Sequence, residues 1–174
     1  MPEEAVTTLR AELDRFERAE EGFALLEVFL EVARPRLGAV VLDPVGLRLP
    51  DEMTDDRALV QELIVGIEGE PRRNGRVVER GFDMEDAQAR WDYVRLAYSS
   101  NQATVWSARH RTTYFEVVGQ RRATYWLPDS LKAEYFEALT ARGWAVPDDW
   151  MAAVAKRPKP WWKRGRAVRE GTPF

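Results

Sequence analysis

The sequence contains no cysteine and a single histidine, His110. Disulfide bonds, thiolate nucleophiles and cysteine-ligated metals are therefore excluded, and the lack of cysteine fits a reducing compartment. One imidazole and scattered carboxylates leave only oxygen-rich sites for hard cations, and no acidic stretch has the spacing of a calcium-binding loop. We therefore expect neither a metal nor a cofactor.

Long apolar runs and phosphate-binding glycine loops are also missing. No stretch reaches the roughly 18 apolar residues that a membrane-spanning helix needs, and the acidic residues 1–4 do not begin a signal peptide. The glycines between Gly66 and Gly81 match neither the Walker nor the dinucleotide fingerprint, and no serine lies in a Gly-x-Ser-x-Gly turn. We expect a cytoplasmic globular protein that is not an enzyme and has no membrane partner.

Aromatic residues and charges are divided unevenly along the chain. All seven tryptophans and all five tyrosines follow residue 90. Residues 1–90 hold 12 basic and 21 acidic side chains, a net of −9, whereas residues 91–174 hold 14 and 8, a net of +6. This division predicts that differently charged faces meet different partners. Arginine outnumbers lysine by 22 to 4, which is typical of a GC-rich bacterial genome.

The acidic half has mainly helical patterns. Apolar residues recur at three- and four-residue spacing over residues 3–34 and predict one long helix that ends before Pro35. A short apolar run predicts a strand at 37–42, and a second helix begins near Asp56. Residues 59–68 fit either the end of this helix or a strand, and the pattern does not decide between them.

The second half predicts a sheet followed by helices. Period-two patterns predict four strands in a β-meander, at 91–98, 103–108, 112–118 and 123–127. Asp129 is expected to cap a helix that Gly143 ends, and a short helix follows Pro147. We therefore predict an α+β fold in which a long N-terminal helix and a C-terminal helix pack on an antiparallel sheet. Residues 1–155 would form a single domain, and residues 156–174 a basic tail containing tryptophan and proline.

The turn Arg109-His110-Arg111 and the strand residue Tyr114 are candidates for contact with a partner. A histidine beside a carboxylate and arginines could also act in acid–base chemistry on a phosphodiester. Alternation alone, however, places polar residues on the outer face of any half-buried strand. We therefore favour binding over catalysis, and expect most of the other aromatic residues on these strands to be core.

The tail combines seven basic residues with Trp161 and Trp162, and includes Arg164. It could dock on the acidic half of its own chain or of a second copy, and the second case would make a homo-oligomer. It could also meet another protein, or bind nucleic acid or a membrane surface through its cations and indoles. The sequence pI of about 5.4 argues against nucleic acid as the main partner.

Residues 127–150 carry a resemblance to a known family. A helix runs into a Leu–Gly-Trp–Pro ending at Leu139, Gly143, Trp144 and Pro147. This stretch resembles the end of type III secretion chaperone-like and YbjN-like bacterial domains. The resemblance implies a non-catalytic α+β module that binds a protein, as a chaperone or as an immunity protein to a toxin. Together with the acidic helical half it gives our leading hypothesis, a module for a basic protein partner; the alternative is a nucleic-acid-associated protein that uses the basic tail and hairpin turns.

Overall fold

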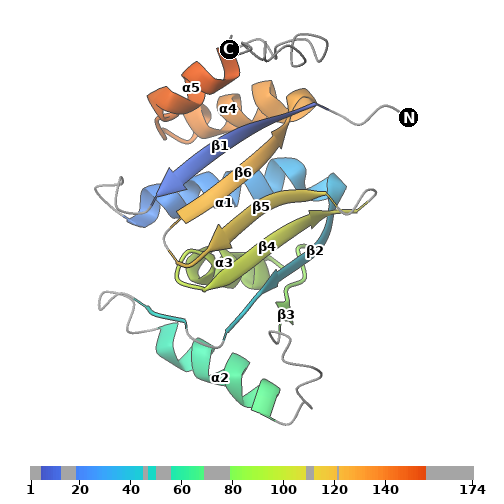
Figure 1. Ribbon diagram of the computed structural model, residues 1–174, viewed down its shortest axis with the longest axis vertical. Coiled ribbons are helices and arrows are strands. Elements are labelled where there is room, and N and C mark those ends of the chain that lie inside the picture. Colours follow the sequence, from blue (N-terminus) through green and yellow to red (C-terminus); the bar gives the residue numbers. More distant parts are fainter. Residues whose placement is uncertain are drawn as a thin grey trace, which may run out of the picture.

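The fold is α+β, with one antiparallel sheet and helices packed on it (Figure 1). The computed structural model describes residues 5–12, 19–44, 47–49, 56–68, 79–108, 112–120 and 122–155. Its elements in chain order are β1 (Val6–Glu12), α1 (Ala19–Ala33), β2 (Leu37–Leu42), α2 (Asp56–Glu68), β3 (Arg80–Gly81), α3 (Ala87–Ala97), β4 (Gln102–Ser107), β5 (Thr113–Val118), β6 (Arg122–Pro128), α4 (Lys132–Ala141) and α5 (Asp148–Ala155). Short 3₁₀ turns follow α1 and precede α4.

Six strands in the described part of the chain pair in the order β1-β6-β5-β4-β2-β3, all antiparallel. The central β4-β5-β6 segment is the meander that the sequence predicts. The first strand joins its far side, where Val6 pairs with Pro128 and Glu12 with Arg122. Two segments more than a hundred residues apart thus lie side by side in the sheet.

The sheet has one covered face and one face without a helix among the described residues. Figure 1 shows α1 and α3 behind the sheet, with α4 and α5 at its β1 side. Strand residues alternate accordingly: Leu9 and Ala11 are buried, whereas Thr8, Arg10 and Glu12 are exposed. The core therefore lies between the sheet and the helices.

The predicted helix over 3–34 is wrong in its first part. Residues 6–12 form an edge strand, and the helix that does form runs from Ala19 to Ala33. The apolar spacing of Leu9 and Ala11 fits a strand equally well, and Val6-Thr7-Thr8 is a β-branched run that disfavours helix. Pairing with β6 settles the conformation, and this long-range contact is not visible in a local window.

The predicted strand over 91–98 is also wrong, because these residues form most of α3. Asp86 caps the helix: its carboxylate accepts from the backbone N–H of Gln88 at 2.8 Å and of Ala89 at 3.4 Å. Most residues of the last two turns are buried, so apolar residues occur on nearly all sides of the helix. Their spacing therefore lacks a clear helical period and resembles the alternation of a strand. The buried residues are Tyr93, Val94, Leu96, Ala97 and Tyr98.

The other elements follow the predicted order, but some of their boundaries and one helix cap differ from the prediction. Residues 59–68 are helical throughout. The short strand β3 pairs with β2 through Arg80 and Gly81. Asp129 does not cap α4. It lies in a 3₁₀ turn, where its carboxylate accepts from the Thr7 hydroxyl at 3.2 Å and pairs with Lys132. Asp129 therefore ties the start of β1 to the end of β6.

Aromatic rings fill the core and carry hydroxyl groups into it. Phe115 contacts Tyr98 and Tyr125 edge-on, with ring centroids 6.0 and 4.8 Å apart. The Tyr98 and Tyr125 hydroxyls form a 2.5 Å hydrogen bond, and the Tyr135 hydroxyl donates to the Leu25 carbonyl at 2.8 Å. Burial raises the pKa of the Tyr93, Tyr98, Tyr125 and Tyr135 phenols well above the usual value. All four are therefore protonated at neutral pH.

Not every strand aromatic is core. Phe115 is completely buried, as predicted, but Trp106 and Trp126 are only half-buried, on the face opposite the helices. Trp91 lies on α3 and is 39% exposed, so the prediction that it is core is wrong. The Trp91 ring does not pack against a neighbouring strand. The Arg95 guanidinium lies over it, 6.0 Å from the ring centroid, in a cation–π contact.

Candidate functional site

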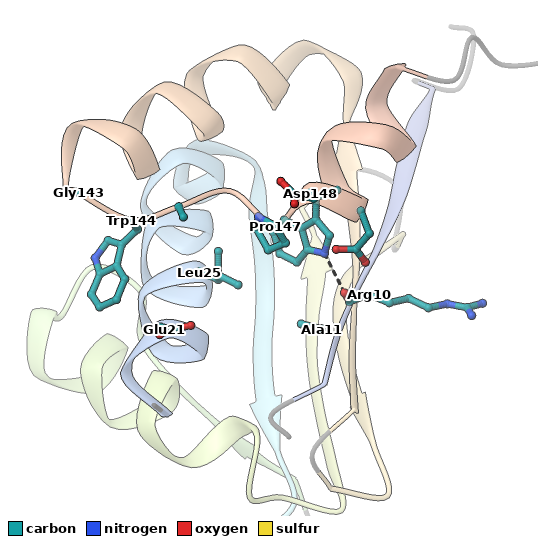
Figure 2. A pocket seen from close by; sticks show the side chains of 11 residues that line it. Arg10, Ala11, Glu21, Leu25, Gly143, Trp144, Pro147 and Asp148 are labelled. Carbon is teal, nitrogen blue, oxygen red and sulfur yellow. Dashed lines mark hydrogen bonds between the residues drawn. The ribbon is translucent and has the colours of Figure 1, made fainter. Parts of the chain in front are cut away.

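A pocket of about 620 Å³ lies between the first turns of α1, strand β1 and the connection from α4 to α5 (Figure 2). Pockets of this size are typical of sites for small molecules or for side chains of a partner. Its described lining consists of Arg10, Ala11, Glu21, Leu25, Gly143, Trp144, Ala145, Pro147, Asp148, Asp149 and Trp150.

The end of α4 fixes the wall that contains Trp144. Gly143 has φ +78°, a left-handed conformation that glycine adopts without strain. Its N–H donates to the Thr140 carbonyl at 2.9 Å, and the Trp144 N–H donates to the Leu139 carbonyl at 3.1 Å. This pair of bonds is a Schellman motif. The predicted role of Gly143 is confirmed, and the backbone that carries the indole is held by two hydrogen bonds.

Trp150 forms an apolar wall and is almost completely buried. Its indole N–H donates to the Arg10 carbonyl at 2.8 Å, and its ring contacts Tyr125 and Tyr135. The Arg10 side chain points away from the pocket, as Figure 2 shows. Arg10 thus contributes its backbone here, and its guanidinium lies on the side of the strand away from α1.

The polar part of the pocket is acidic. Glu21 lies in the first turn of α1, and Asp148 and Asp149 lie in the first turn of α5. Helix N-termini carry a partial positive charge that stabilises carboxylates at these positions. The only cation among the described lining residues is Arg10, whose side chain is turned away. The pocket therefore presents three carboxylates beside two indoles.

This combination suits a cationic group with an apolar stem. A lysine or arginine side chain can pair its charge with the carboxylates and lay its methylene groups on an indole face. The described lining contains no hydroxyl, thiol or imidazole side chain. Among the described residues, no three histidine, cysteine, aspartate or glutamate side chains gather as metal ligands would.

Of the sequence-predicted contact residues, the structure describes only Tyr114, which is not in the described lining of the pocket. Tyr114 is buried on β5 and belongs to the hydrophobic core, at the point where the pairing of β4 and β5 shifts register between Val105 and Trp106. The other six predicted residues come from the turn at 109–111 and from the tail. Arg109, His110, Arg111, Trp161, Trp162 and Arg164 all lie outside the described residues.

Sequence reasoning did not identify the pocket, because its walls come from three separate segments of the chain. A usable signal existed in residues 143–150, where Trp144 and Trp150 flank the acidic pair Asp148-Asp149. We interpreted these residues as a helix ending and a helix start, which is correct. The same residues also face a cavity, and that depends on how α1 and β1 pack against them.

None of the described helices is both long and apolar enough to cross a membrane. Comparison with known proteins identifies no relative of the chain. No protein-family model, curated protein or solved structure matches the chain.

Proposed function

We propose that the chain is a non-catalytic, cytoplasmic protein-binding module of the chaperone or toxin-immunity type, and that its pocket receives a basic segment of the partner. The observation that carries this proposal is the set of three carboxylates beside Trp144 and Trp150. Opposite charge on the partner speeds encounter and excludes partners of like charge.

The resemblance at residues 127–150 supports the same assignment. Three of the residues that carry it, Gly143, Trp144 and Pro147, line the pocket. The resemblance implies a protein-binding module, and the pocket supplies a place for that protein to bind. The lack of cysteine fits the proposed compartment.

The experiment compares full-length chains that differ by two charges. Asp148→Asn with Asp149→Asn removes two pocket carboxylates, and Glu85→Gln with Glu134→Gln removes two exposed carboxylates outside it. Each tagged chain is incubated with extract from the source cells. We expect one basic protein to bind the wild type and the control equally, and to bind the pocket variant at least about tenfold more weakly, a loss of about 1.4 kcal/mol. Equal capture by all three chains would rule out the pocket as the site.

The non-catalytic part of the proposal has its own test at His110. His110→Ala should leave the cellular role intact, because we assign the single imidazole no chemical step. Loss of that role, with an unchanged melting temperature, would contradict the non-catalytic part of the proposal.

One observation favours a second candidate function. Trp106 of β4 and Trp126 of β6 are half-buried and alternate with core residues, so both lie on the sheet face that has no described helix. Aromatic rows on open sheets can stack the bases of single-stranded nucleic acid. Binding that weakens steeply with salt in a gel-shift assay, and that Trp126→Ala abolishes, would favour this function over the first.

A further inference from the structure

We infer that the segment received by the pocket is bipartite, with a basic residue for the acidic pocket and a large apolar side chain for an adjoining groove that shares Trp144 with the pocket. This inference rests on the proposed function. It extends the proposed function, because the acidic pocket alone specifies only the basic residue of the partner segment.

The groove is lined by residues of α4, of α5 and of the connection between them. It has a volume of about 710 Å³ and shares Trp144 and Ala145 with the acidic pocket. Its other described lining residues are Phe136, Glu137, Thr140, Ala141, Val146 and Met151. The two hollows are therefore neighbours along the short connection that joins the two helices.

The groove is an accessible apolar surface. Met151 is 51% exposed, and Phe136, Trp144 and Val146 are only half-buried. Methionine is flexible and polarisable, so it adapts to apolar side chains of different shape. Large apolar residues left open beside a charged site are typical of a surface that a partner covers.

Charge complementarity selects the occupant. Three carboxylates line the pocket, whereas Glu137 is the only charged residue in the described lining of the groove. A purely basic segment would leave the apolar groove exposed, and a purely apolar segment would place no positive charge beside the carboxylates. A polypeptide with lysine or arginine a few residues from a large aliphatic or aromatic residue satisfies both hollows at once. Trp144 would contact both parts.

The test uses a displayed library of random peptides, selected on the full-length chain. We expect the enriched peptides to combine a basic residue with a large apolar residue at short spacing. Selection on Asp148→Asn with Asp149→Asn should lose the basic preference and keep the apolar one. Selection on Met151→Ser should do the reverse. Glu85→Gln with Glu134→Gln serves as the control for charge, and a thermal melt confirms that each variant is folded.

Binding of the best enriched peptide is then titrated by fluorescence polarisation. Each pocket or groove variant should weaken it about tenfold, as expected when one anchor of a small interface is removed. Peptides enriched only in basic residues, with no effect of Met151→Ser, would overturn the bipartite ligand and leave the proposed function standing. Failure to enrich any peptide that depends on Asp148 and Asp149 would overturn both.

Discussion

The Trp150 indole donates a hydrogen bond to the main-chain carbonyl of Arg10, 140 residues earlier in the sequence, with the two atoms 2.8 Å apart. Arg10 lies on β1, which is the last strand at its end of the sheet. Edge strands expose backbone groups that can pair with other chains. Trp150 satisfies one of these groups, and α5 packs against the strand. The same contact holds β1 and α5 together as two walls of the acidic pocket.

Trp150→Phe should therefore destabilise the protein while keeping most of the apolar contact. Phenylalanine has no N–H, so the partly buried Arg10 carbonyl loses its donor at a cost of about 1–3 kcal/mol. Chemical denaturation measures the free energy of unfolding. The matched control is Trp91→Phe, because Trp91 is 39% exposed and donates no hydrogen bond that the structure shows. Equal losses in the two variants would contradict the role of the indole N–H.

Phe115→Ala should be among the more damaging single changes in the sheet. Phe115 is completely buried between Tyr98 and Tyr125, and truncating such a ring leaves a cavity that costs about 3–5 kcal/mol. Val118→Ala on the same strand is the control, since Val118 is 58% exposed. The measurement is again the free energy of unfolding. A loss below about 1 kcal/mol for Phe115→Ala would mean that the ring does not pack as the structure has it.

The elements that the sequence predicted correctly have local signals. The helix from Asp56, the strands of the central meander and the helix ending at Gly143 depend on periodicity, turn residues and a C-terminal glycine. The two wrong predictions lie where long-range packing decides. Residues 6–12 are a strand because β6 pairs with them, and residues 91–98 are a helix that is buried on nearly all sides, which hides its period.

The candidate site was harder to predict than the fold. Asp148 and Asp149 are correctly explained as residues of a helix start, and Trp144 as the residue after a C-terminal glycine. Their second role depends on the position of Glu21 and Trp150 around a shared cavity. Such a cavity is a property of packing between distant segments. Composition suggested only that an acidic region would meet a basic partner.

Stability should fall as the pH rises above about 10, the pKa of an unfolded tyrosine. Burial raises the pKa of Tyr98 and Tyr125 in the folded protein, so the native state keeps phenolic protons that the unfolded chain loses. The native state then binds more protons, and the free energy of unfolding decreases with pH. The stabilisation is complete below about pH 10 and is lost as the pH rises towards the folded-state pKa values.

Urea denaturation at a series of pH values checks this dependence. Each buried phenol contributes up to about 1.4 kcal/mol per pH unit above the unfolded pKa. Tyr98→Phe combined with Tyr125→Phe removes two of these groups, so its stability should decrease less steeply with pH than that of the wild type. Parallel pH dependences of the two proteins would show that these phenols are not responsible.

Deleting residues 156–174 should lower the melting temperature or dissociate an oligomer, and should hardly change affinity for nucleic acid. The segment holds seven cations and two tryptophans, and it follows directly after α5, whose first turn carries Asp148 and Asp149. Cations and indoles of this kind suit an acidic surface of the same chain or of a second copy. The loss should shrink at high salt, because exposed ion pairs are screened.

The measurement is a thermal melt of the intact and shortened chains at two salt concentrations, with size-exclusion chromatography and a gel-shift titration alongside. Nucleic-acid binding through the tail would have a different signature. The intact chain would bind single strands with an affinity that falls steeply with salt, because each phosphate contact releases counterions, and the shortened chain would not bind. That result, with equal melting temperatures and unchanged oligomeric state, would replace docking by nucleic-acid binding as the role of the tail.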